Sequence, residues 1–124
     1  MSASRITCFA AAIAVAATLA LPMKHAAAST FFAWQVADVP WGDLLFVRNY
    51  PSPKSALQGA YPNGTVLQMT GTCTDNLDLN DIAGAPQDAQ TAEVRYRWCQ
   101  VWHDPSHSGA YVLGWVYGKY IQPH

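Results

Sequence analysis

Two stretches of alternating apolar and polar residues, each with one cysteine on its apolar side, constrain this chain most. Residues 65–73 and 94–103 both have the period of a β-strand, and their cysteines are Cys73 and Cys99. If the two strands pair antiparallel, both sulfur atoms point into one core. We therefore predict a Cys73–Cys99 disulfide, which would stabilise a small exported domain by about 3–4 kcal/mol. A catalytic or metal-binding thiol is the alternative use of this pair.

The first 28 residues have the features of a secretory signal peptide. Arg5 supplies a positive charge, residues 6–21 form an Ala-rich apolar run, and Ala26-Ala27-Ala28 provides a small-residue cleavage site. The apolar run is shorter than the ~20 residues that span a bilayer, although a retained anchor is the alternative. We expect residues 29–124 to form one mature domain, either periplasmic or secreted.

The charge of the predicted mature part excludes several classes of partner. Without Arg5 and Lys24 the seven basic residues fall to five against eight acidic ones, a net charge of −3. Nothing here is basic enough to indicate nucleic acid or an anionic membrane surface. All five Trp and all six Tyr remain after residue 28, a density that suits a small β-rich domain.

The remaining apolar stretches are short and bounded by Gly, Pro and Asn, which predicts strands rather than helices. They lie at residues 30–37, 44–48, 56–60 and 110–117, the first of them being either a strand or a docked arm. Residues 74–93 are polar and acidic without apolar periodicity, so we predict a long surface loop with at most one helical turn near 79–83. The fold class is therefore all-β, with about five short strands in a small barrel or sandwich.

Four short motifs follow one another over roughly residues 36–122. They are Leu45-Phe46-Val47-Arg48 followed by Pro51-Ser52, then Gly59 with residues 62–66, then Trp98 to Val101, and finally residues 114–116 with Tyr120-Ile121. In this order the motifs resemble those of the bacterial Src-homology-3-type domain of exported proteins. The resemblance implies a five-stranded barrel with a short 3-10 turn near the C-terminus. It also implies a module that binds peptides or cell-wall components. The insertion at 74–93 and the PWGD stretch at 40–43 depart from the family pattern.

Aromatic side chains are the best candidates for contact with a ligand. Strand alternation places Trp98 and Trp102 on the face opposite Cys99, and Tyr117 on the face opposite Val116. The resemblance implies a peptide groove that contains Trp98 and Tyr120. An alternative role for these rings is to cap a thin core. The candidate ligand-binding residues are Trp98, Tyr120, Tyr50, Trp102 and Tyr117.

The remaining sequence patterns give only weak evidence for a metal site or an enzyme. His103 and His107 flank Asp104 and could hold a metal ion, but a solvated polar turn is the interpretation that we prefer, because zinc sites use three or four fixed ligands. The alternating Asn76, Asp78 and Asn80 lack the glycine and the final glutamate of a calcium loop. The sequence has neither G-x-S-x-G nor H-E-x-x-H. We therefore predict no enzyme activity, no metal and no cofactor.

The predicted function is that of a monomeric binding module of the bacterial envelope. Its aromatic surface would recognise cell-wall peptide or glycan, or a partner protein. The alternative is a structural or inhibitory protein that engages a basic partner through the acidic segment 74–93. An envelope hydrolase is a third hypothesis, which no motif supports.

Overall fold

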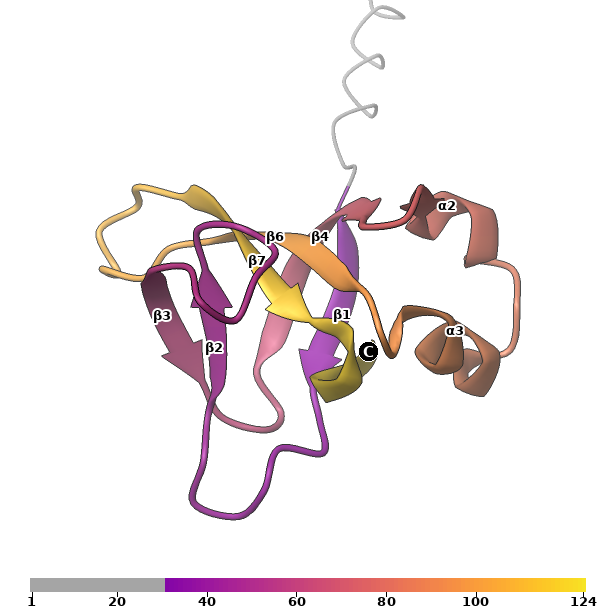
Figure 1. Cartoon of the computed structure of the whole chain (residues 1–124), viewed down its shortest axis with the longest axis horizontal. Helices are drawn as coiled ribbons and strands as arrows, with labels where there is room; N and C mark the ends of the chain where they lie inside the picture. The colour runs from indigo at the N-terminus through magenta and orange to yellow at the C-terminus, as the bar shows by residue number, and fades with distance from the viewer. Residues whose placement is uncertain (1–30) are drawn as a thin grey trace, which may run out of the picture. The chain divides into compact units, whose positions relative to one another are not determined.

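The computed structural model describes residues 31–124 (Figure 1). The predicted signal peptide at residues 1–28 lies outside the described residues. The strands are β1 (Phe32–Val36), β2 (Leu45–Arg48), β3 (Leu57–Tyr61), β4 (Val66–Cys73), β5 (Leu77–Asp78), β6 (Trp98–His103), β7 (Val112–Tyr117) and β8 (Ile121–Pro123). The helices are α2 (Leu79–Ile82), α3 (Gln87–Val94) and a 3-10 helix at Gly118–Tyr120.

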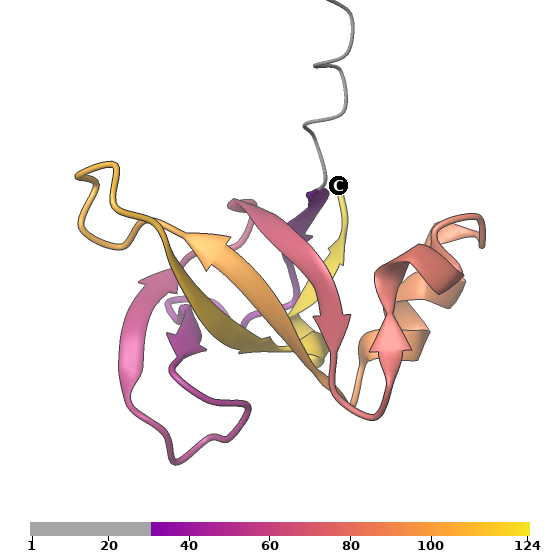
Figure 2. The ribbon, with the colours of Figure 1, turned by 90° about the horizontal axis from the view of Figure 1, so that it is seen from above.

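The eight strands form one open antiparallel sheet in the order β3-β2-β7-β6-β4-β1-β8, with β5 attached to β4. Figure 2 shows how strongly this sheet curves (β4 pink, β6 orange, β7 yellow). The β-rich architecture and the 3-10 turn are confirmed, but the prediction of a five-stranded barrel is wrong. Strands β2 and β3 form a hairpin that joins the sheet where Arg48 pairs with Trp115, and β5 lies in the insertion.

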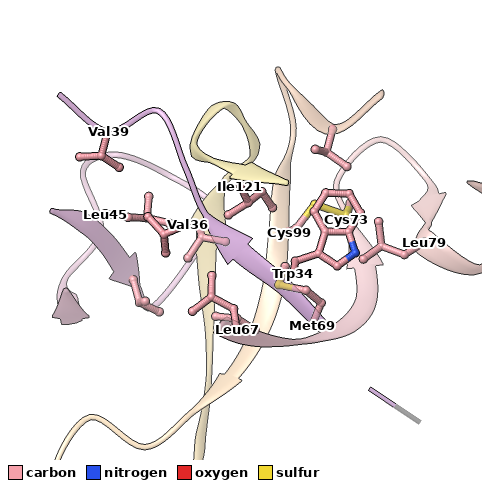
Figure 3. Packing of buried hydrophobic residues seen from close by; sticks show 14 residues of the cluster. Trp34, Val36, Val39, Leu45, Leu67, Met69, Cys73, Leu79, Cys99 and Ile121 are labelled. Carbon is pink, nitrogen blue, oxygen red and sulfur yellow. A yellow bond between two sulfur atoms is a disulfide. The ribbon is translucent and has the colours of Figure 1, made fainter. Parts of the chain in front are cut away.

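The core lies on the inner face of the sheet, where alternate residues of β1, β2, β4, β6 and β7 are buried. On β6, for example, Cys99, Val101 and His103 are buried while the residues between them are half-exposed. Figure 3 shows Trp34 and Met69 packed beside the two cysteines. The full cluster consists of Trp34, Val36, Val39, Leu45, Val47, Leu67, Met69, Cys73, Leu79, Val94, Cys99, Val101, Val116 and Ile121. This alternation agrees with the faces predicted from the sequence.

The opposite side of the three central strands is called the outer face here. Its members alternate with the buried residues of β4, β6 and β7, and the register aligns Trp98 with Tyr117, Gln100 with Trp115, and Trp102 with Leu113. The outer face consists of Val66, Gln68, Thr70, Thr72, Trp98, Gln100, Trp102, Leu113, Trp115 and Tyr117. All of these side chains are uncharged.

The predicted disulfide is confirmed. Cys73 and Cys99 are register partners on β4 and β6, and their sulfur atoms are bonded within the core (Figure 3). Immediately beside this bond, the Thr74 N–H donates to Trp98 O at 2.8 Å and the Trp98 N–H donates to Thr74 Oγ1 at 2.9 Å. The covalent bond and two hydrogen bonds therefore hold the first residues of β6 against the end of β4.

Residues 74–93 are not a long loop, because they contain β5, α2 and all of α3 except its last residue, Val94. Asp78 caps α2 by accepting a hydrogen bond from the Asn80 N–H at 2.9 Å, and Leu79 is buried. The predicted helical turn near 79–83 is thus confirmed as α2. The eight-residue α3 was not predicted because Val94 is its only buried residue, so its sequence has no apolar period.

The next strand begins at Trp98 rather than at residue 94 because Val94 ends α3. Gly118 lies directly against this helix end, and a Cβ atom there would overlap the carbonyl of Val94. The Gly118 N–H also donates to Arg97 O at 2.8 Å. The absence of a side chain at position 118 therefore lets the 3-10 helix pack onto the chain between α3 and β6.

A buried histidine ties the β2–β3 hairpin to the central strands. The Gln58 amide donates to Asn49 Oδ1 at 2.6 Å and to Leu113 O at 3.0 Å, so its Oε1 must accept from His103 Nε2, 2.8 Å away. His103 Nδ1 is then an acceptor for the Tyr61 hydroxyl at 2.7 Å. His103 is only 5% exposed, so the prediction of a solvated polar turn is wrong for this residue.

None of the helices within residues 31–124 is long and apolar enough to cross a membrane. The disulfide fits a periplasmic or secreted protein, and that location stays a prediction.

Replacing both Cys73 and Cys99 with alanine should lower the free energy of unfolding by about 2–5 kcal/mol. The bond joins residues 26 positions apart, and its loss frees the unfolded chain from that loop. Urea denaturation followed by circular dichroism measures the change. The parent protein treated with a reductant should match the double variant, and equal midpoints for oxidised parent and variant would contradict the stabilising role.

Acidification should destabilise the fold through His103. Burial lowers the pKa of the His103 imidazole below its ordinary value of 6.5, although the Asp104 carboxylate acts in the opposite direction. The unfolded chain therefore binds this proton more readily, so stability is lost as the pH falls below about 6.5 toward the lower folded-state pKa. A His103→Gln variant should show a flatter dependence of unfolding free energy on pH between neutral and mildly acidic conditions.

The matched control is His107→Asn, at an exposed position of the same turn whose φ of 56° asparagine accepts. This variant should keep the pH dependence of the parent. If His103→Gln and the parent lose stability equally on acidification, the buried histidine does not carry the effect.

Candidate functional site

A cleft of about 540 Å³ opens on the described part of the chain. Its lining is mostly apolar and aromatic, with one acidic and one basic side chain. The lining residues are Val39, Pro40, Asp43, Leu44, Leu45, Phe46, Arg48, Pro53, Trp98, Tyr117 and Tyr120. These residues are referred to below as the cleft.

Two walls of different origin face each other across the cleft. The first comes from the segment before β2, from β2 itself and from Pro53 in the hairpin loop. The second comes from the first residue of β6, the last residue of β7 and the 3-10 helix. Leu44 and Phe46 in the first wall are 42% and 39% exposed, so both offer apolar surface to a ligand in the cleft.

The second wall is a continuous group of three aromatic rings, from Trp98, Tyr117 and Tyr120. The ring centroids of Trp98 and Tyr117 are 5.3 Å apart, and those of Tyr117 and Tyr120 are 6.4 Å apart. Lys119 Nζ lies 5.6 Å from the centroid of the Tyr120 ring. Such rings offer a large and rigid contact area to a ligand, since they have few rotatable bonds.

The fold determines the position of each ring. Trp98 is held by its two backbone hydrogen bonds to Thr74 beside the disulfide. Tyr117 is its register partner on β7. Tyr120 ends the 3-10 helix, and its carbonyl accepts from the Ala37 N–H at 2.9 Å. The aromatic wall is therefore built on ordered backbone at each of its three members.

The charged groups of the cleft lie in its first wall. Arg48 donates through Nη1 to Ser55 O at 2.9 Å and lies over the Phe46 ring, 5.8 Å from the centroid. Asp43 accepts from the Leu44 N–H at 2.8 Å and is exposed. A ligand in the cleft would therefore meet one carboxylate and one guanidinium at the rim of an apolar surface.

Three of the five candidate residues predicted from the sequence come together in the cleft, namely Trp98, Tyr117 and Tyr120. Tyr50 is 69% exposed and does not line the cleft. Trp102 also lies elsewhere, because it is four positions along β6 from Trp98 and at the other end of the outer face.

Sequence reasoning missed the first wall of the cleft. Its main members are Leu44, Phe46, Asp43 and Pro53. Two signals pointed to this region, namely the Leu45-Phe46-Val47-Arg48 motif and the adjacent PWGD departure from the family pattern. Neither could show that the segment folds over the start of β6, because that placement depends on the pairing of β2 with β7.

Trp102 lines a second, smaller hollow of about 210 Å³, and its ring stacks on Tyr111 with centroids 6.2 Å apart and an interplanar angle of 21°. The other residues of this hollow are Tyr61, Thr65, Val66, Leu67, Gln68, His103, Asp104 and His107. Hydrogen bonds from the Gly109 and Ser108 N–H groups lower the pKa of Asp104, which keeps this carboxylate ionised.

Metal chemistry has little support in residues 31–124, where no three His, Cys, Asp or Glu side chains gather in a way that could hold an ion. Both nitrogens of His103 are already engaged with Tyr61 and Gln58, so it cannot join His107 as a ligand without breaking that network. Cys73 and Cys99 are bonded to each other and offer no free thiol.

Comparison with models of known protein families, with curated proteins and with solved structures finds no match to this chain.

Proposed function

We propose that this protein is a non-enzymatic binding module of the bacterial envelope and that its cleft holds an extended peptide, from the cell wall or from a partner protein. The observation that carries this proposal is the wall of three contiguous rings, from Trp98, Tyr117 and Tyr120, facing exposed apolar side chains across an open cleft. Surfaces of this kind bind peptides through their side chains and through ring contacts.

The charges at the rim suit a wall peptide. Such a peptide carries both ammonium and carboxylate groups, for which Asp43 and Arg48 are opposite partners. The rings of the second wall would take the aliphatic side chains. A wall peptide is therefore the first ligand to test.

The order of elements supports a variant of the bacterial Src-homology-3 type. Strands β1, β4, β6, β7 and β8 follow one another with a 3-10 helix before the last, and the β2–β3 hairpin fills the connection between β1 and β4. The variant differs from the implied barrel by having an open sheet of eight strands. The proposed relationship rests on this order and on the four sequence motifs.

The acidic segment 74–93 supports the alternative function less well. Arg97 forms an ion pair with Glu93 at 3.6 Å and donates to the carbonyls of Thr74 and Asp75. Part of the acidic charge is thus balanced within the segment's own surroundings. Neither the cleft nor the second hollow is lined by a residue of α2 or α3.

The cleft should be tested with Trp98→Ala and Tyr120→Ala variants. If the protein binds purified sacculi, each variant should bind about 10- to 30-fold more weakly, because a buried aromatic anchor at the centre of an interface contributes roughly 1.4–2 kcal/mol or more. Co-sedimentation of each protein with sacculi at low and high salt measures the loss.

Tyr96→Ala is the matched control, since Tyr96 is 75% exposed and lies outside the cleft. Near-ultraviolet circular dichroism should show that all variants remain folded. If the parent protein does not sediment with sacculi at either salt concentration, the cell wall is not its ligand. If Trp98→Ala binds as well as the parent, the cleft is not the binding site.

A further inference from the structure

The outer face extends the aromatic surface well beyond the cleft. From the cleft, where Trp98 pairs with Tyr117, the next row across β6 and β7 is Gln100 with Trp115, and the row after that is Trp102 with Leu113. Trp102 then stacks on Tyr111 in the second hollow. Rings and aliphatic groups therefore continue from one hollow to the other along β6.

This surface combines rings with neutral hydrogen-bonding groups. Thr70 donates through Oγ1 to Gln100 Oε1 at 2.9 Å, which orients the Gln100 amide. The NH2 group of this amide is then the part that can donate to a ligand. Gln68 is exposed and pairs in register with Trp102. No residue of the outer face is charged, and the nearest cation in the register is Arg48 of β2, the partner of Trp115. The rings and amides together match a ligand that has both apolar faces and hydroxyl or amide groups.

The central strands of this surface have neighbouring strands on both sides. Strand β6 pairs with β4 on one side and with β7 on the other, and β7 pairs with β6 and β2. A ligand lying on the outer face can therefore form no β-ladder with it and must bind through side chains alone. A sugar ring needs only a stacking surface and side-chain hydrogen bonds, and the outer face offers both.

We propose that the outer face of β6 and β7 is a second binding site, and that it takes a neutral glycan chain lying along β6. The Trp102 and Trp115 rings would stack on pyranose rings, and the Gln100 and Gln68 amides would bond hydroxyl or acetamido groups. Trp98 and Trp102 are four residues apart on one strand, a span of about 13 Å at ~3.3 Å per residue, so the site is longer than one sugar ring.

The second hollow supplies a polar end to this site. The Asp104 carboxylate and the Tyr61 hydroxyl lie beside the stacked Trp102 and Tyr111 rings. The Tyr61 hydroxyl donates its hydrogen bond to His103 Nδ1, so its oxygen remains available to accept a hydrogen bond from a sugar hydroxyl. This proposal does not depend on what the cleft binds.

The test uses soluble, uncharged oligomers of β-linked N-acetylglucosamine as the probe, in a dimer and a hexamer, with the purified protein. Isothermal titration calorimetry should show tighter binding of the hexamer than of the dimer, because the longer chain contacts several rows of the outer face. Trp102→Ala should weaken hexamer binding on the order of tenfold through loss of one stacking ring. Leu113→Glu, at a side chain that is 46% exposed, should weaken it without disturbing the core.

Trp41→Ala is the control, because Trp41 is fully exposed and lies outside both hollows. Amide shifts on titration should fall on Gln68, Gln100 and Leu113. The proposal is overturned if the hexamer does not bind, if Trp102→Ala and Leu113→Glu bind it like the parent, or if the shifts fall only in the cleft. The peptide proposal is tested separately through Tyr120→Ala, because Tyr120 lines the cleft and is not part of the outer face.

Discussion

The pairing of β4 with β6 is the interaction on which the rest of the structure depends. At its end the Cys73–Cys99 bond lies in the core, and the reciprocal hydrogen bonds between Thr74 and Trp98 lie immediately beside it. Since side chains alternate along β6, burying Cys99 directs Trp98 to the outer face. One covalent constraint thus stabilises the fold and positions the first ring of the cleft.

The two proposed sites differ in which parts of the fold build them. The cleft lies between elements distant in sequence, with the segment around β2 on one side and the ends of β6 and β7 on the other, so its shape depends on the hairpin. That hairpin is held by the Gln58–His103–Tyr61 network. The outer face, in contrast, is a regular surface of paired strands whose side-chain spacing follows from the register. A protein of this design could hold a peptide at one end of its sheet and a glycan along it.

The sequence allowed the faces of the strands to be predicted, because the alternation around Cys73 and Cys99 is strong and the core is one-sided. It also allowed three rings of the cleft to be identified. It did not predict α3, where only Val94 is buried, nor the burial of His103, whose partners Tyr61 and Gln58 lie more than 40 positions away. The separation of Trp102 from Trp98 also required the three-dimensional arrangement, since both share one face of one strand and differ only in which hollow they reach.

A nuclear magnetic resonance titration with soluble wall peptides shows whether the cleft is a peptide-binding site. Added peptide should shift the indole and backbone signals of Trp98 together with the amides of Phe46, Tyr117 and Tyr120, in a saturable manner. Saturable shifts confined to α2 and α3, or no shifts at millimolar peptide, would contradict it.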